Sequence, residues 1–135
     1  VDVDNTDNPI EAGLGFAVKL DKPGGFIGRD ALAQIKARGV PKTRMLQFLL
    51  KDPEPLLYGN ELILLNGEEV GYIQVGGYGH SLGAATGIGF AEHAEPLTAE
   101  VVAQGHWQIA IAGEVFDATA SPKPIYDPQM AKIKC

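Results

Sequence analysis

The stretch Glu61–Phe90, ELILLNGEEVGYIQVGGYGHSLGAATGIGF, decides the fold that the sequence predicts. Its apolar run Leu62–Leu65 ends at Asn66–Gly67. This dipeptide favours a type I′ hairpin turn, because both central residues of that turn need positive φ. A return strand is expected over Val70–Tyr78, where β-branched and aromatic residues are frequent. Glycines near its end are expected to break or sharply bend it, as at the corners of small barrels. They are Gly76, Gly77 and Gly79.

The composition is that of a globular protein: of 135 residues, 45% are hydrophobic and 21% charged. A net charge of −6 argues against a nucleic-acid partner and against an acidic membrane surface. The only cysteine is Cys135, so no intrachain disulfide is possible. The chain starts without methionine and with acidic residues, so we expect a processed chain or a fragment. We expect a soluble protein of the cytoplasm, or of the mitochondrial matrix if the source is eukaryotic.

Two elements are expected before residue 40. Apolar residues alternate with small or polar ones over 14–20, which is the period of a half-buried strand. Phe26–Gly39 has apolar residues at helical spacing and is the only convincing helix. Gly39 can cap its C-terminus, and Pro41 prevents its continuation. The alternating residues are Leu14, Phe16, Val18 and Leu20, and those of the helix are Ile27, Ala31, Leu32 and Ile35.

The pattern changes at Val40–Thr43, where we place a domain boundary between residues 1–42 and 43–135. Beyond it, short strand-like segments alternate with tight turns, and a proline-rich tail follows. About six strands after one helix favour a mainly β fold, α+β overall, with a small antiparallel barrel or sandwich. The segments are 45–50, 62–65, 70–78, 84–90, 97–103, 107–112 and 115–120.

His80, His93 and His106 are the obvious candidates for a general base or a metal ligand. None has a second ligand type at a metal-like spacing, so the sequence predicts no metal site. His80 is next to Ser81 in a glycine-rich turn, but adjacent residues rarely point at each other. We therefore favour a structural or hydrogen-bonding role for His80 over catalysis, and we expect the other two histidines to be solvated in loops.

The string GGYGHSLG could cradle a phosphate only if a helix followed it, because a helix N-terminus binds the phosphate. The next residues, AATGIGF, would make a poor helix, so barrel bends are favoured. Asp2, Asp4 and Asp7 lack the glycine and glutamate of a calcium loop, which favours a solvated acidic terminus. From the residues alone, Phe16 is a core residue and Arg44 an exposed arginine at a strand start.

Three strings together resemble a known family. They are NPIEAGLGFAVKLDKPGGFIGRDALAQIKARG, YGNELILLNGEEVGYIQVGGYGHSLGAATGIGFA and ASPKPIYDP. They resemble the C-terminal end of the glycine-cleavage T-protein (aminomethyltransferase) family, especially the flavoenzymes dimethylglycine dehydrogenase and sarcosine dehydrogenase. The resemblance runs in order from Asn8 to about Pro128.

This resemblance implies that residues 1–42 end a folate-binding core and that residues 43–135 form a separate barrel. It implies one-carbon transfer to tetrahydrofolate, together with an upstream core and an FAD domain as partners. The family's catalytic aspartate and FAD domain are absent from this chain, so it should not be catalytic alone or bind FAD. Phe16 matches a residue that packs on folate, Arg44 one that lines its channel, and Glu11 matches with a less defined role. The alternative is a non-catalytic regulatory or protein-binding relative.

Overall fold

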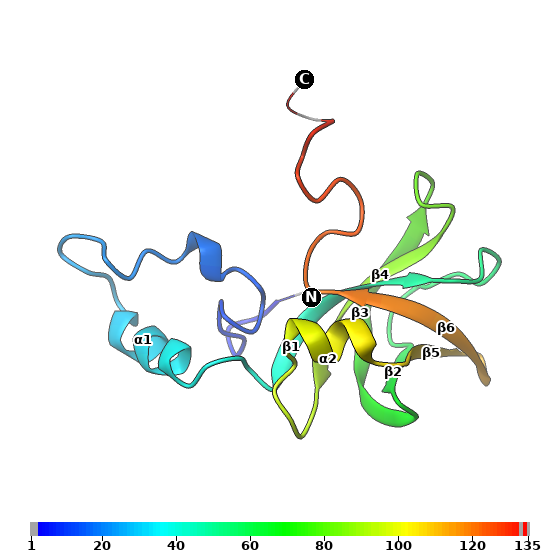
Figure 1. Cartoon of the computed structure of the whole chain (residues 1–135), viewed down its shortest axis with the longest axis horizontal. Helices are drawn as coiled ribbons and strands as arrows, with labels where there is room; N and C mark the ends of the chain where they lie inside the picture. The colour runs from blue at the N-terminus through cyan, green and yellow to red at the C-terminus, as the bar shows by residue number, and fades with distance from the viewer. Residues whose placement is uncertain (1–2, 133, 135) are drawn as a thin grey trace.

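The computed structural model describes residues 3–132 and 134, and its centre is a closed antiparallel barrel (Figure 1). The strand order around the barrel is β1-β4-β3-β2-β5-β6, and β6 returns to pair with β1. Closure leaves no long unpaired edge, which explains how such short strands form a stable sheet. The strands are β1 Thr43–Leu50, β2 Leu62–Leu65, β3 Glu68–Gly79, β4 Ala84–Glu92, β5 Trp107–Ile111 and β6 Glu114–Ser121. The predicted mainly β fold with a small six-stranded antiparallel barrel is therefore confirmed.

The β2–β3 hairpin has the predicted turn. Asn66 has φ 53° and Gly67 has φ 86°, so both central residues lie in the left-handed region that a type I′ turn requires. The expected break at the glycines is not found, because β3 continues to Gly79. The register of β3 against β4 does shift, but at a point before the glycines, between Ile73 and Val75. Gly76 instead permits a close approach, since an added Cβ would overlap the backbone of Leu57.

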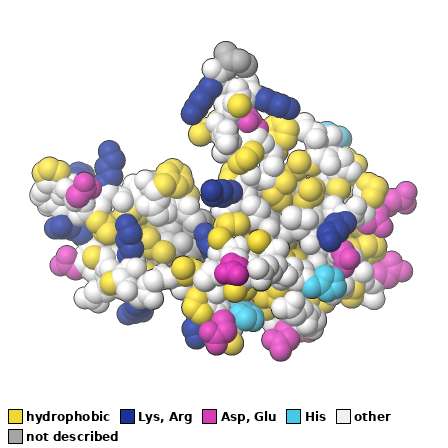
Figure 2. All heavy atoms as spheres, viewed as in Figure 1, with side chains coloured by type: hydrophobic (Ala, Val, Ile, Leu, Met, Phe, Trp, Pro, Cys, Tyr) yellow, Lys and Arg dark blue, Asp and Glu magenta, His cyan; other side chains and the backbone are white. Residues whose placement is uncertain are grey.

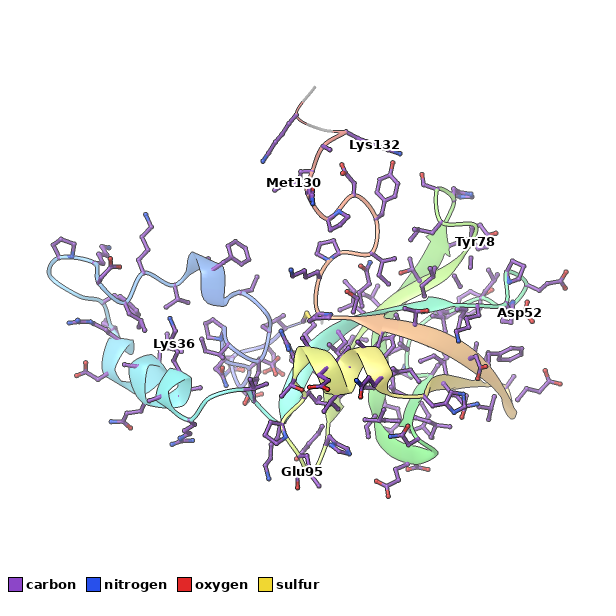
Figure 3. The ribbon with its side chains drawn as sticks, viewed as in Figure 1. Lys36, Asp52, Tyr78, Glu95, Met130 and Lys132 are labelled. Carbon is purple, nitrogen blue, oxygen red and sulfur yellow. The ribbon has the colours of Figure 1, made fainter. Side chains whose placement is uncertain are left out.

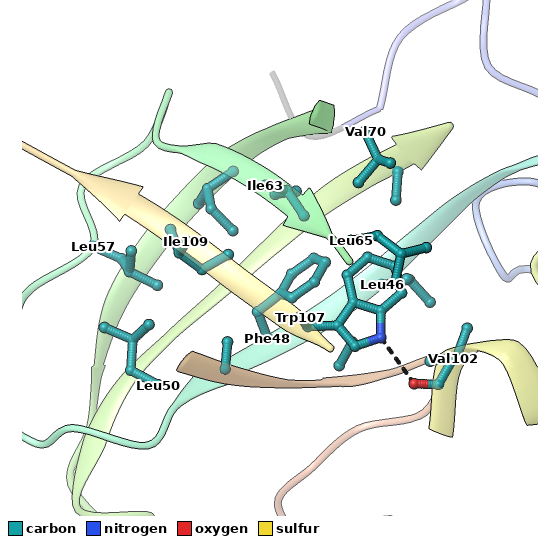
Figure 4. Close-up of a cluster of buried hydrophobic side chains, with 14 of the residues drawn as sticks. Leu46, Phe48, Leu50, Leu57, Ile63, Leu65, Val70, Val102, Trp107 and Ile109 are labelled. Atoms are coloured by element: carbon teal, nitrogen blue, oxygen red, sulfur yellow. Dashed lines mark hydrogen bonds between the residues drawn. The ribbon is translucent and has the colours of Figure 1, made fainter. Parts of the chain in front are cut away.

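The barrel core is formed by side chains that point inward from all six strands, mostly at every second position (Figure 4). The ring of Trp107 meets that of Phe48 edge-on, with centroids 5.6 Å apart. The indole nitrogen of Trp107 donates a hydrogen bond of 2.9 Å to the carbonyl oxygen of Val102, so its one polar atom is satisfied. The other fully buried large side chains are Leu46, Leu50, Ile63, Leu65, Ile73, Leu97 and Ile109.

The strand predicted over residues 14–20 is wrong. The segment forms a short 3-10 helix, η1, at Gly15–Ala17, flanked by turns. Its hydrogen bonds are local, for example from the amide of Ala17 to the carbonyl of Leu14, 3.0 Å. A period-2 pattern makes a strand only where a neighbouring strand supplies hydrogen-bond partners, and the barrel closes without this segment.

The predicted helix exists but is shorter than Phe26–Gly39. Helix α1 spans Arg29–Ala37. It begins late because Gly28 has φ 87°, a left-handed conformation outside the helix. Gly39 has φ 90° and donates its amide to the carbonyl of Lys36, so the predicted glycine cap is confirmed.

A second helix, α2 at Ala99–Gln104, replaces the strand expected over 97–103. Thr98 caps it, because its hydroxyl oxygen accepts a hydrogen bond of 3.2 Å from the amide of Val101. Val102 is the buried residue of α2 and packs on the barrel core. The helix therefore covers one end of the barrel instead of joining the sheet.

The tail after β6 is tied to the barrel near its start and then leads away from it (Figure 1). The amide of Ile125 donates a hydrogen bond of 2.6 Å to the side-chain oxygen of Gln47 on β1. The interpretations that involve Asp2 and Cys135 lie outside the described residues.

Candidate functional site

Glu11 lies where the N-terminal segment meets the barrel. Its carbonyl oxygen accepts a hydrogen bond of 2.8 Å from the amide of Met45 on β1. Its own amide donates to the side-chain oxygen of Asn8, 3.1 Å. Glu11 also lines a groove of about 380 Å³, the junction groove, with Asn8 and residues between Ile35 and Thr43. The structure therefore places the backbone of Glu11 at the start of the barrel.

Arg44 directly precedes Met45 in β1 and is half-buried, so its interpretation as an exposed arginine is wrong. Its Nη1 donates a hydrogen bond of 3.0 Å to the carbonyl oxygen of Leu97, just before α2. Burial lowers the pKa of the guanidinium, but an arginine pKa starts so far above neutrality that the group stays charged. In the described part of the chain no carboxylate pairs with it. Arg44 is thus a desolvated cation with donors available for an anion.

Phe16 is not a core residue, because 86% of its surface is exposed on η1. It lines neither the junction groove nor a second groove between η1 and α1. The backbone hydrogen bond between Glu11 and Met45 therefore places Glu11 beside the strand that carries Arg44, whereas the structure shows no contact of Phe16 with this strand among the hydrogen bonds of the described residues. Its free ring can still pack on a flat ligand or on another protein surface.

The histidines do not form a metal site: the described residues contain no group of three His, Cys, Asp or Glu side chains that could hold an ion. The ring of His80 packs edge-on against Tyr78, with centroids 5.2 Å apart. His93 contacts the backbone of Glu95 through Nδ1 at 3.2 Å. These contacts support the structural interpretation of His80 and give neither histidine a nucleophile to activate.

The glycine-rich string 76–83 does not form a phosphate cradle. Gly77 and Gly79 belong to β3, a short turn follows, and the chain continues into β4. No helix N-terminus follows the glycines, so the backbone dipole that would bind a phosphate is missing at this position.

One polar cluster was not foreseen from the sequence. Nε2 of His106 and Oδ1 of Asp117 are 2.9 Å apart, and the same oxygen accepts a hydrogen bond of 3.1 Å from Gln108. The hydrogen bond with His106, and after it that from Gln108, lowers the pKa of Asp117. The cluster exists because Gln108 and Asp117 are paired in the β5–β6 register. No local motif could have predicted it, since Gln108 and Asp117 lie on different strands.

The tail holds a second exposed cluster around Tyr126. Nζ of Lys132 lies 3.2 Å from its hydroxyl oxygen and 4.9 Å from its ring centroid. Figure 3 shows Lys132 on the part of the tail that has led away from the barrel. The hydrogen bond with Lys132, and after it one with Ser81, lowers the pKa of Tyr126. Neither cluster lines the junction groove with Glu11.

The profile of the family "Glycine cleavage T-protein C-terminal barrel domain" matches residues 43–127, which begin at the first residue of β1. The chain belongs to this family. The family resemblance expected from the sequence is therefore confirmed. The expected similarity to sarcosine dehydrogenase and to dimethylglycine dehydrogenase is confirmed as well, since both are among the relatives that the chain matches.

Two curated relatives and one solved structure illustrate the match. The chain is 35% identical over 133 residues to 4-methylaminobutanoate oxidase (formaldehyde-forming) of Paenarthrobacter nicotinovorans, covering 98% of this chain and 15% of the relative. It is 32% identical over 130 residues to mitochondrial sarcosine dehydrogenase of Homo sapiens, and this match covers 95% of this chain and 14% of the relative. The fold matches that of the glycine cleavage system aminomethyltransferase T from Bartonella henselae, with a TM-score of 0.70 and 20% sequence identity. The match covers 87% of this chain and 32% of the aminomethyltransferase chain.

The chain thus spans only 14–15% of the length of these two relatives. The sarcosine dehydrogenase is named as a mitochondrial protein. Within residues 3–132 and 134, no helix is long and apolar enough to cross a membrane.

Proposed function

We propose that this chain is the C-terminal part of a folate-dependent aminomethyltransferase module in a protein resembling dimethylglycine and sarcosine dehydrogenases. The similarity to such enzymes extends over 95–98% of the chain, which supports the proposal. The observation that carries it is Arg44, a half-buried cation with no carboxylate partner in the described residues. Retaining a desolvated charge of this kind is expected where an anionic ligand or partner completes it.

Tetrahydrofolate fits the residues present in two respects. Its glutamate carboxylate is a partner for the guanidinium of Arg44, since arginine binds carboxylates through charge-assisted hydrogen bonds. Its flat rings suit an exposed aromatic side chain such as Phe16. Glu11 would act by its position, because its carbonyl holds the N-terminal segment to β1. The folate itself supplies the acceptor for the one-carbon unit.

The remaining parts of the proposal concern the rest of the protein. The catalytic aspartate would lie in an upstream folate-binding core and the FAD in a separate upstream domain, and this chain would be inactive alone. The division at residues 42 and 43 stays a prediction, as does a location in the cytoplasm or the mitochondrial matrix.

The proposal is tested with the full-length protein that carries this chain, by measuring its affinity for tetrahydrofolate under anaerobic conditions. Phe16→Ala should weaken binding roughly three- to tenfold, the range of an aromatic packing contact. Tyr58→Ala is the matched control, because Tyr58 is 79% exposed on a barrel loop and should leave the affinity unchanged. A full-length protein that binds no folate would refute the proposal and favour the regulatory alternative.

A further inference from the structure

A groove lies where the tail leaves the barrel, between α2, the end of β6 and the first residues of the tail. We call it the tail groove. Its volume is about 570 Å³, which is in the range of small-molecule sites in proteins. It is lined by none of Glu11, Phe16 and Arg44, so it is separate from the residues proposed for folate.

The floor of the tail groove is apolar. Val102 and Trp107 line it, and each is only 2% exposed. The indole nitrogen of Trp107 donates to the carbonyl oxygen of Val102, so both of these polar groups already have partners. Ala118 and Ala120 of β6 also line the groove and add only short apolar side chains. An apolar group is therefore the part of a ligand that this floor favours, because a polar group there would lose its hydrogen bonds to water.

The wall that the tail contributes is held by hydrogen bonds. The amide of Ile125, which lines the groove, donates to the side-chain oxygen of Gln47 on β1 at 2.6 Å. The hydroxyl of Ser121 donates to the carbonyl oxygen of Lys123 at 2.8 Å and accepts from its amide at 3.1 Å. The wall is thus formed before any ligand binds, which lowers the entropic cost of binding.

The only charged residues that line the tail groove are Lys51, directly after β1, and Lys123 in the tail. Within the described residues, neither ammonium group forms an ion pair. The hydrogen bonds with His106 and Gln108 lower the pKa of Asp117, and the charge of Lys51 adds to them, but Lys51 and Asp117 are not within ion-pair distance. Figure 2 shows basic side chains beside apolar ones where the tail leaves the barrel. The groove therefore combines an apolar floor with two cations that lack a counter-charge.

We propose that the tail groove binds an organic carboxylate with an apolar body, such as a medium-chain fatty acid. The apolar body would lie on the floor, and the carboxylate would accept hydrogen bonds from Lys51 and Lys123. An alkylamine would be repelled by both ammonium groups, and a neutral alcohol would leave them without a counter-charge. The site goes beyond the proposed function and does not require folate binding.

Isothermal titration calorimetry of the full-length protein tests the ligand class with three probes of equal chain length. They are octanoate, octan-1-ol and octylamine. Octanoate should bind at least about tenfold more tightly than either of the others, because only octanoate pairs with the ammonium groups.

Substitutions then test the place of binding. Ala103 is exposed on α2 and lines the groove, so Ala103→Trp should fill it and weaken octanoate binding at least about tenfold. Ala99→Trp is the matched control, since Ala99 is exposed on the same helix but outside the groove. Far-ultraviolet circular dichroism checks that both variants fold.

Charge substitutions provide a second test that leaves the shape of the groove intact. The double variant Lys51→Gln with Lys123→Gln should weaken octanoate binding about tenfold and leave octan-1-ol binding unchanged. Lys36→Gln is the control, because Lys36 is exposed on α1 and does not line the groove.

Three results would overturn the inference. One is the absence of octanoate binding by the full-length protein. Another is an affinity for octan-1-ol or octylamine equal to that for octanoate. The third is octanoate binding that neither Ala103→Trp nor the double lysine variant weakens. Octanoate binding by a protein that binds no tetrahydrofolate would refute the proposed function alone, whereas folate binding without octanoate binding would refute this inference alone.

Discussion

The amide of Met45 donates a hydrogen bond of 2.8 Å to the carbonyl oxygen of Glu11. This contact lies where β1 no longer pairs with β6, whose register covers only residues 47–50 of β1. The N-terminal segment therefore satisfies an amide that the barrel leaves without a partner. It also fixes the segment beside Arg44, which directly precedes Met45 in β1.

Arg44→Gln should weaken tetrahydrofolate binding by the full-length protein about tenfold or more, because a charge-assisted hydrogen bond to a carboxylate is lost. Arg29→Gln is the control, since Arg29 is exposed at the start of α1 and lies outside the junction groove. Arg44 also donates to the carbonyl of Leu97, so urea unfolding should show a loss of about 1 kcal/mol. An unchanged dissociation constant would remove Arg44 from the folate site.

Gly71→Ala should destabilise the protein by about 3 kcal/mol or more, the upper range for overpacking. An added Cβ would overlap the carbonyl oxygen of Phe90 on β4, and this backbone cannot move within the closed barrel. Gly77→Ala is a matched control on the same strand, because no atom lies within 4 Å of its added Cβ. Urea denaturation measures both, and equal midpoints would contradict the close approach of β3 and β4.

Trp107→Phe should lower the free energy of unfolding by about 2 kcal/mol. The smaller ring leaves a gap beside Phe48, and the carbonyl of Val102 loses its indole donor. Val115→Ala, at an exposed position of β6, should change stability by less than about 0.5 kcal/mol. Chemical denaturation followed by far-ultraviolet circular dichroism compares the two variants, and similar values would show that Trp107 is not central to the core.

Asp117→Asn should make the stability of the protein less dependent on pH in the acid range. The hydrogen bond with His106 lowers the folded-state pKa of Asp117, so its contribution is present above the unfolded value of about 3.9. That contribution disappears as the pH falls through the folded pKa. Wild-type and variant urea midpoints should therefore differ more at about pH 6 than at about pH 3. Glu68→Gln, exposed in the hairpin, is the control, and parallel pH profiles for wild type and Asp117→Asn would contradict the coupling.

Features that depend on residues close together in the sequence were predictable. The left-handed turn at Asn66–Gly67 and the helix cap at Gly39 follow from conformations that few other residues adopt. The wrong prediction of a strand over 97–103, where the structure has helix α2, also has a local cause. An apolar run of that length does not distinguish a helix from a strand, and the cap at Thr98 was the signal that would have decided it.

The candidate site was predictable only in part. Family resemblance pointed to Glu11, Phe16 and Arg44, but residue patterns alone gave the wrong exposure for Phe16 and Arg44. The His106–Asp117 contact depends on the pairing of β5 with β6, which no short window of sequence contains.

By itself, the sequence determined the positions of the hairpin turn, the helix cap and the strands of the barrel, and the family of the chain. The tertiary structure decided which of its apolar patterns are covered. Leu14 and Phe16 alternate as Leu46 and Phe48 do, yet the first pair is exposed and the second is buried. The reason is that burial requires a second surface, and the closed barrel provides one only for the side chains that point into it.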